Sequence, residues 1–243
     1  MTPLCSATAA ALYKTFVKGE CVITNARTAE MCKLTENSFR DVNIAFANEL
    51  SLICDKQDIN VWELIRLANL HPRVNILQPG PGVGGHCIAV DPWFIVSACP
   101  DEARLIKTAR EVNDHKPNWV VEKVKILIEQ YLSENSSKNL KDVCVACFGL
   151  SFKANIDDLR ESPALEIAKS IGGLEISQLL IVEPHIQELP SSLAKAKLVS
   201  PENALDAAHI LVLLVDHRGF EKYSQPASKK LVIDTRGMWS RSM

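Results

Sequence analysis

The sequence has no long run of one charge sign, no long apolar run and no basic N-terminal region. Its 243 residues contain 27 Lys and Arg against 29 Asp and Glu, so it lacks the basic surface typical of a DNA- or RNA-binding protein. No stretch approaches the ~18 consecutive apolar residues of a membrane span, and no signal peptide begins the chain. These absences argue against nucleic acid and membrane as partners and predict a cytoplasmic protein.

The eight cysteines do not form a disulfide framework in the sequence pattern. They are scattered through apolar segments, so most are expected to be small buried hydrophobes. Cys144 and Cys147 lie in one apolar predicted strand, where residues three apart face opposite sides. No second ligand pair follows them at zinc-site spacing, so no metal site is predicted.

Hydrophobic periodicity predicts helices in the first half of the chain. The segments at helical spacing are 3–18, 28–57, 61–69, 101–113 and 117–132. Pro117 is expected to open the last of them, since proline is favourable in a first turn. With a short strand at 21–24, residues 1–27 resemble the end of a domain, and residues 28–133 are predicted to form an all-helical central domain.

The pattern changes after the polar segment 133–139. Short apolar, β-branched runs typical of strands buried on both faces follow at 143–148, 179–182, 210–215 and 231–233. A helix capped by Ser162 and opened by Pro163 lies between the first two runs. Alternating strands and helices predict a Rossmann-like, parallel α/β domain over 139–243, and hence an α/β fold class with a helical central domain before it.

A loop rich in glycine and proline precedes the fourth predicted helix. Residues 71–92 hold four of the ten glycines and four of the twelve prolines, and the block 80–92 contains Cys87. Unlike a phosphate-binding glycine loop, it does not follow a strand and open a helix. The residues alone leave two interpretations open, a thiol nucleophile on a tight turn or a structural turn with an inert cysteine.

Three ordered segments decide between these interpretations. They are 29–37 (Ala-Glu-Met-Cys-Lys-Leu-Thr-Glu-Asn), 80–92 preceded by His-Pro-Arg at 71–73, and 148–153 (Phe-Gly-Leu-Ser-Phe-Lys) followed by Asp-Asp-Leu-Arg-Glu-Ser-Pro at 157–163. Together they resemble the UDP-glucose/GDP-mannose dehydrogenase family, and most closely its branch that oxidises UDP-N-acetyl-D-mannosamine to the uronic acid for cell-surface polysaccharides. The resemblance implies a four-electron oxidation with two NAD.

The resemblance also implies roles for four residues near the cysteine. Cys87 would form a thiohemiacetal and then a thioester with the substrate. Lys33 and Asn37, four apart on one helix face, would stabilise the developing oxyanion and orient the attacking water. Asp91 would activate that water, although a residue before Pro92 is also a common turn former.

Further residues are expected to contact substrate and cofactor. Lys153 follows the first predicted strand and Arg236 the last, so both are expected at the carboxyl edge of the sheet. The resemblance gives them the UDP moiety and places Arg160 near the NAD.

The glycines and a second subunit complete the expected site. Gly84 and Gly85 would let the substrate approach the thiol. Arg73 resembles a substrate-contacting arginine lent by the neighbouring subunit. The resemblance therefore implies a homodimer formed through the central helical domain.

One part of the family pattern is missing. Members begin with an NAD-binding Rossmann domain that has a Gly-rich fingerprint. Residues 1–27 contain a single glycine, Gly19, and so lack this fingerprint. The chain is therefore expected to be a fragment of such an enzyme, or to depend on a separately encoded half. Two alternatives stay open: a catalytically inactive module that binds a UDP-sugar and dimerises, and a hydrolase or acyltransferase that uses Cys87.

Overall fold

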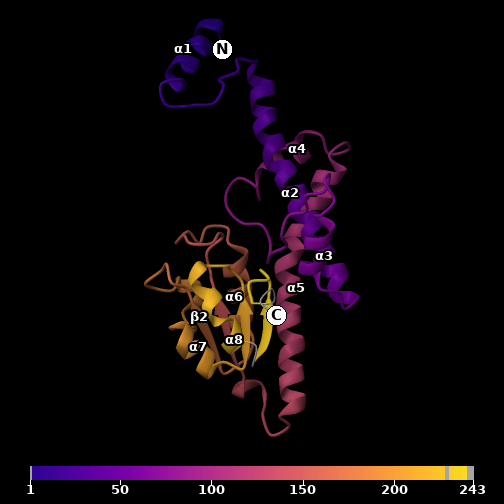
Figure 1. Cartoon of the computed structure of the whole chain (residues 1–243). Coiled ribbons are helices and arrows are strands. Elements are labelled where there is room, and N and C mark those ends of the chain that lie inside the picture. Colours follow the sequence, from indigo (N-terminus) through magenta and orange to yellow (C-terminus); the bar gives the residue numbers. More distant parts are fainter. Residues whose placement is uncertain (1, 228–229, 240–243) are drawn as a thin grey trace.

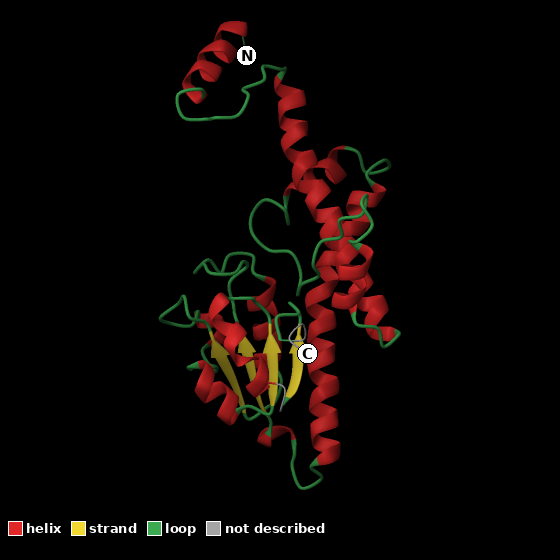
Figure 2. Cartoon of the chain, viewed as in Figure 1, coloured by secondary structure: helices red, strands yellow, loops and turns green. Residues whose placement is uncertain are grey.

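The chain builds a helical part and an α/β part, which lie against successive halves of one long helix (Figure 1). The computed structural model describes residues 2–227 and 230–239. The helical part contains α1 (Pro3–Tyr13), α2 (Ala26–Lys56), α3 (Val61–Ala68), α4 (Asp91–Ala98) and α5 (Arg104–Glu134). All described strands belong to the second part (Figure 2).

Helix α2 is the first long element and carries part of the candidate site. The Asn25 side chain caps it by accepting from the Thr28 N–H, which satisfies one of the free donors at a helix start. Its buried face combines small apolar residues with polar ones, among them Asn37, Asp41 and Asn48. The helix packs against α4 and α5 with this polar face. A helix over 28–57 was predicted, and the structure confirms it with bounds shifted by up to two residues.

The prediction of two helices at 101–113 and 117–132 is wrong, because α5 is a single helix. It runs unbroken from Arg104 to Glu134 with Pro117 inside, rather than at the start of a second helix. An internal proline removes a backbone hydrogen bond and costs about 3 kcal/mol. Packing on both sides of the proline offsets this cost, since Arg110 and Asn113 contact α2 while Val120 and Val124 pack into the core of the sheet.

The α/β part is built on a parallel sheet of five strands. They are β1 (Cys144–Phe148), β2 (Gln178–Val182), β3 (Lys197–Leu198), β4 (Ile210–Leu213) and β5 (Leu231–Asp234), in the order β3-β2-β1-β4-β5. The helices α6 (Pro163–Gly172), α7 (Pro201–Ala207) and α8 (Ser224–Ala227) connect or flank them, with short 3-10 turns at Leu140–Asp142, Ser191–Leu193 and Arg218–Tyr223. The Rossmann-like α/β fold is thereby confirmed. The strand order reverses between β1 and β4, where such sheets bind ligands.

Both faces of the sheet are covered. Val145 and Cys147 point into a core formed with α5 and α6, whereas Cys144, Ala146 and Phe148 point into a core formed with α7 and the residues after β4. Cys144 and Cys147 therefore lie on opposite faces, as predicted. Burial raises the pKa of the Cys147 thiol to about 12, which keeps it in its unreactive form.

The cysteines and the first 25 residues depart from the predictions. The expectation that most cysteines are buried is wrong, since Cys5, Cys32, Cys87 and Cys99 are exposed. The first helix ends at Tyr13 rather than 18, and no strand forms at 21–24 because no described strand lies beside it to pair with. Among the helices that the structure describes, none is long and apolar enough to span a membrane.

The packing of α5 also bears on the domain limits. Its first half contacts α2, and its second half belongs to the hydrophobic core of the sheet. By packing, the α/β part thus includes several turns of a helix that precedes the polar segment 133–139. The limits 1–27, 28–133 and 139–243 remain a prediction.

Candidate active site

Cys87 opens a helical turn that leads directly into α4. The N–H groups of Val90 and Asp91 donate to the Cys87 carbonyl at 3.2 and 2.8 Å. The cysteine side chain is exposed, and Asp91 is the first residue of the helix. The loop therefore presents the thiol on the surface and sets Asp91 one turn behind it.

Asp91 meets the predicted pair on α2. The Asn37 amide Nδ2 donates to Asp91 Oδ2 at 2.5 Å, and Lys33 Nζ donates to Asn37 Oδ1 at 3.3 Å. Asn37 is buried, whereas 62% of the Lys33 side chain is exposed and its ammonium also lies 3.9 Å from Glu36. The structure thus brings three of the four predicted residues into one hydrogen-bonded row, one turn away from Cys87.

A buried polar chain connects α2 to the start of the glycine loop. Asn48 Oδ1 accepts from the Gly80 N–H at 2.9 Å, and Asn48 Nδ2 donates to Asn113 Oδ1 at 2.9 Å. Asn113 donates in turn to Asp41, which Arg110 contacts at 2.6 Å. Burial raises the pKa of Asp41 despite the attraction of the Arg110 guanidinium. Unpaired, these groups would each be costly to bury, so the chain fixes where the loop begins.

Sequence reasoning missed this polar chain. Asp41 and Asn48 are seven residues apart on α2, and Asn113 lies on α5 at a buried position. Polar residues that recur at helical spacing on α2 were the available signal. Without the structure, their partner Gly80 could not be identified.

The glycine loop packs tightly against the α/β part. A Cβ added at Gly80 would lie 2.5 Å from Arg236 Nη1, and one added at Gly84 would lie 2.5 Å from the Glu161 carbonyl oxygen. Gly85 adopts a φ of +82°, and its N–H donates to the same carbonyl at 3.3 Å. The close approach that requires these glycines is therefore to the chain's own residues, the Glu161 backbone at Gly84 and the Phe152 ring at Gly85. Their predicted contact with substrate remains a prediction.

Two basic residues stand at the carboxyl edge of the sheet as expected. Lys153 lies in the loop after β1 and is exposed. Arg236 follows β5, and its Nε donates to Asp216 Oδ1 at 2.9 Å while its other end lies against Gly80. Both residues thus flank the point between β1 and β4 where the strand order reverses, and the glycine loop lies over the same edge.

The other two predicted arginines are placed differently. Arg160 is exposed and bonds the Asp158 carboxylate through Nε and Nη2, which lowers the pKa of Asp158 to about 2. Its neighbour Glu161 contacts the glycine loop, so Arg160 lies close to the cysteine loop. Arg73 is exposed after α3, and its backbone N–H donates to His71 at 3.3 Å. Among the described residues Arg73 does not join the row of Lys33, Asn37 and Asp91.

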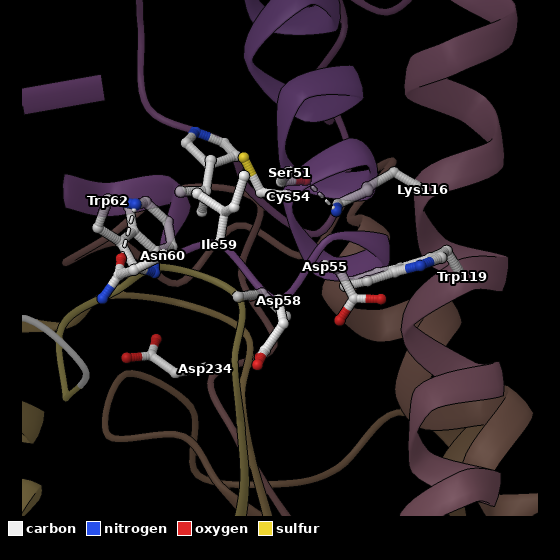
Figure 3. A pocket seen from close by; sticks show the side chains of 13 residues that line it. Ser51, Cys54, Asp55, Asp58, Ile59, Asn60, Trp62, Lys116, Trp119 and Asp234 are labelled. Carbon is white, nitrogen blue, oxygen red and sulfur yellow. Dashed lines mark hydrogen bonds between the residues drawn. The ribbon is translucent and has the colours of Figure 1, made fainter. Parts of the chain in front are cut away.

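A cavity of about 420 Å³ lies between α2, α3, α5 and the loop after β5 (Figure 3). Lys116 Nζ donates to Ser51 Oγ at 2.5 Å and lies 3.8 Å from the centroid of the Trp119 ring. Burial lowers the pKa of Lys116 to about 7. Figure 3 shows Asp234 on the opposite side of this cavity, so the cavity borders the strand end that carries Arg236.

A dinucleotide does not fit the described α/β part in the usual mode. The turn after β1 reads Gly-Leu-Ser-Phe-Lys at 149–153, without a Gly-x-Gly-x-x-Gly fingerprint. Glu183 follows β2, the position whose carboxylate binds the ribose in dinucleotide-binding sheets. Its side chain is fully buried and bonds backbone N–H groups of the chain itself. NAD therefore has no built site among these residues.

Known proteins resemble both parts of the chain. Residues 27–115 match the UDP-glucose/GDP-mannose dehydrogenase family, central domain, and residues 146–241 match the UDP binding domain of the same family. A UDP-N-acetyl-D-mannosamine dehydrogenase of Salmonella typhi is 64% identical over 241 residues, covering 98% of this chain and 57% of that protein. An NDP-N-acetyl-D-galactosaminuronic acid dehydrogenase of Ralstonia solanacearum is 61% identical and covers 99% and 55%.

Solved structures agree with the sequence matches. The UDP-D-ManNAc dehydrogenase of Pyrococcus horikoshii superposes with a TM-score of 0.81 at 35% identity, covering 97% of this chain and 54% of that one. Cap5O of Staphylococcus aureus, a UDP-N-acetyl-mannosamine dehydrogenase, gives 0.78 at 41% identity, covering 98% and 54%. The chain spans about half the length of the curated relatives it matches. It belongs to the UDP-glucose/GDP-mannose dehydrogenase family.

Proposed function

We propose that this chain supplies the reactive cysteine and the UDP-sugar-binding part of a dehydrogenase that converts UDP-N-acetyl-D-mannosamine to its uronic acid. The observation that carries the proposal is the hydrogen bond between Asn37 and Asp91 beside the exposed Cys87. It joins hydrogen-bond donors and a carboxylate one helical turn along the chain from the thiol. The names of the similar proteins from Salmonella typhi and Pyrococcus horikoshii support the choice of sugar.

The residues near Cys87 suit addition to an aldehyde. The Cys87 thiolate attacks the carbonyl carbon of the sugar aldehyde, a carbon–sulfur bond forms, and the carbonyl electron pair moves to oxygen. Lys33 Nζ and the Asn37 amide donate hydrogen bonds toward that oxygen, which stabilises its negative charge. Donors held in place by α2 need little rearrangement as this charge develops.

In the release of the acid, the sulfur is the leaving group instead of the nucleophile. Water attacks the thioester carbonyl carbon, Asp91 accepts a proton from that water, and the carbon–sulfur bond breaks to regenerate the thiolate. The two oxidations between alcohol and thioester each require a hydride acceptor. The family resemblance implies NAD for both and places Arg160 near it, and because the described α/β part has no dinucleotide site of the usual kind, we assign no other residue to these two steps.

Lys153 and Arg236 suit the diphosphate of the substrate. Both stand at the carboxyl edge near the reversal between β1 and β4. An arginine donates two hydrogen bonds in one plane to phosphate oxygens, and a lysine adds a point charge. Binding there would direct the sugar toward the glycine loop that leads to Cys87.

We also propose a homodimer formed through α2. Phe39, Phe46 and Ile53 follow one another at seven-residue spacing on this helix and are 69%, 53% and 43% exposed. Residues at this spacing lie on one face, so they form a continuous apolar stripe opposite the polar face that contacts α4 and α5. A second copy with the same stripe would cover it.

A second candidate function has its own support. The described α/β part lacks a dinucleotide site of the usual kind, which favours a module that binds a UDP-sugar without turning it over. Purified chain is incubated with UDP-N-acetyl-D-mannosamine and NAD, and absorbance of NADH is followed, while calorimetry measures binding of the sugar nucleotide. Sustained NADH supports the dehydrogenase, binding without NADH supports the module, and absence of both contradicts the proposal. Turnover of an ester without NAD would instead support a hydrolase.

A further inference from the structure

The loop between β1 and α6 carries Lys153 and is tied to two buried side chains from neighbouring strands. Glu183 follows β2 directly, and His217 follows β4. Their side chains are 0% and 1% exposed, and Glu183 Oε2 lies 3.1 Å from His217 Nε2. Both stand at the carboxyl edge of the sheet, on either side of the first residues of the loop.

Glu183 holds the beginning of the loop. Its Oε2 accepts from the N–H groups of Leu150 and Ser151 at 2.7 and 3.2 Å, and its Oε1 accepts from the His185 N–H at 3.1 Å. Burial raises the pKa of this carboxyl, but the hydrogen bonds from His217 and the backbone outweigh burial and lower the pKa overall. Glu183 therefore stays ionised, and its carboxylate holds the loop by accepting hydrogen bonds from the loop's N–H groups.

His217 holds the end of the same loop segment. Its Nδ1 accepts from the Asn155 N–H at 2.9 Å, which requires a lone pair on Nδ1. The ring proton is then on Nε2, from which His217 donates to Glu183. Asn155 adopts a left-handed φ of 61°, and its Oδ1 accepts from the Arg218 N–H at 3.1 Å. Two bonds thus fix this residue to the turn after β4.

The same geometry argues against a metal ion at this cluster. Glu183, His185 and His217 offer ligand atoms within 4.8 Å of one another. A metal on Nε2 of His217 would require the proton to move to Nδ1, where it would meet the N–H of Asn155. The polar atoms of Glu183 and His217 are already satisfied by the chain, so the cluster is a structural clamp rather than a metal site.

We infer that the Glu183–His217 pair positions Lys153 for the diphosphate of the nucleotide sugar. The pair fixes residues 150, 151 and 155, and the Ser151 hydroxyl donates to the Lys153 carbonyl oxygen at 2.7 Å inside the fixed segment. The Lys153 backbone is thereby held on both sides while its side chain is exposed at the ligand-binding edge. Glu183 and His217 are positioning residues, and this inference rests on the proposed function.

The chain offers a matched control for His217. His209 stands at the other end of β4, and its Nδ1 accepts from the Cys144 N–H at 3.0 Å. Its ring stacks on Tyr131 with centroids 4.6 Å apart. His209 thus makes the same kind of bond at the amino edge of the sheet, remote from Lys153.

The test measures UDP binding by calorimetry for the whole chain and four variants. His217→Gln keeps a donor for Glu183 but loses the acceptor for Asn155, so we expect its Kd for UDP to rise about tenfold. His209→Gln is expected to lower the Tm about as much as His217→Gln does, and to leave the Kd for UDP unchanged. In a Lys153→Met background, where Kd is already raised, His217→Gln is expected to add little, because both changes remove the same contact.

The possible outcomes are distinct. Unchanged UDP affinity in His217→Gln, or an equal effect of His217→Gln with and without Lys153, overturns the positioning role alone. A loss of affinity in His209→Gln as large as that in His217→Gln would reduce the effect to general instability and overturn it as well. Failure of the unaltered chain to bind UDP contradicts the proposed function, and the inference with it.

Discussion

The Asn37 side-chain amide donates to the Asp91 carboxylate at 2.5 Å, although the two residues are 54 positions apart in the chain. This contact joins α2 to the first residue of α4 and therefore to the turn that presents Cys87. The proposed chemistry depends on it, since it holds a carboxylate and two donors one helical turn along the chain from Cys87. The Asn37–Asp91 contact can be tested by measurements of stability, without an activity assay.

Asn37→Asp is expected to set two carboxylates against each other. Their repulsion raises the pKa of one carboxyl, so the folded variant holds a proton that the unfolded chain has lost at neutral pH. Its free energy of unfolding should fall by roughly 1–3 kcal/mol at pH 7, with Lys33 offsetting part of the loss, and recover toward pH 4. Urea unfolding at both pH values measures this. Asn118→Asp, at an exposed position on α5, is the control, and equal losses in the two variants would argue against the Asn37–Asp91 contact.

Asn48→Leu is expected to destabilise the start of the glycine loop. It leaves the buried Gly80 N–H and Asn113 without their partner, which costs about 2–4 kcal/mol. Urea unfolding gives the value, and Asn118→Leu, at an exposed position on α5, provides the comparison, with a change within about 0.5 kcal/mol. If Asn48→Leu unfolds at the same urea concentration as the unaltered chain, the buried polar chain does not fix the loop.

Lys116 predicts a pH dependence of stability. Burial lowers its pKa from 10.5 to about 7, and the nearby Lys123 acts in the same direction while Asp55 opposes it. Between these values the unfolded chain binds a proton that the folded chain lacks, so the free energy of unfolding rises with pH from about 7 upward. From pH 7 to 9 the gain is roughly 2–3 kcal/mol. Below pH 7 both states are protonated, and Lys116 adds no further slope.

Substitution isolates this effect. Lys116→Met is expected to flatten the rise in the free energy of unfolding between pH 7 and 9, measured with urea. Lys125→Met removes an exposed lysine paired with Glu122 and should preserve the slope. An unchanged slope in Lys116→Met would show that its amine is protonated in the folded chain.

Phe46→Glu is expected to separate the proposed dimer. The charge falls in the middle of the apolar stripe of Phe39, Phe46 and Ile53, where a second copy would have to bury it. Sedimentation velocity should show a shift from dimer to monomer of at least tenfold in Kd. Ile126→Glu, at a position on α5 that is 52% exposed, should leave the distribution unchanged. If the chain without substitutions is monomeric at all concentrations, the proposed dimer is contradicted.

The sequence predicted what depends on local pattern. The strands from β1 to β5, except the two-residue β3, follow from short β-branched runs, and the shared helix face of Lys33 and Asn37 follows from their spacing. The position of Lys153 and Arg236 at one edge follows from parallel strand order. Each of these depends only on near neighbours or on the general rules of a parallel sheet.

Long-range packing decided what the sequence could not predict. Pro117 lies inside α5 because α2 holds one half of the helix and the sheet holds the other. The bond of Asn48 to Gly80 and the clamp of Glu183 and His217 pair residues that are 32 and 34 positions apart. Polar residues in apolar surroundings indicated that partners exist, but the fold alone identifies them.

Protection of Cys87 by substrate tests the central claim most directly. Purified chain is treated with iodoacetamide with and without UDP-N-acetyl-D-mannosamine, and mass spectrometry follows each cysteine. Cys5 and Cys99 are exposed internal controls, and the buried Cys147 should react only in urea. The account predicts that the sugar nucleotide slows alkylation of Cys87 at least tenfold and leaves Cys5 and Cys99 unaffected. Equal rates at Cys87 with and without a saturating sugar nucleotide would contradict it.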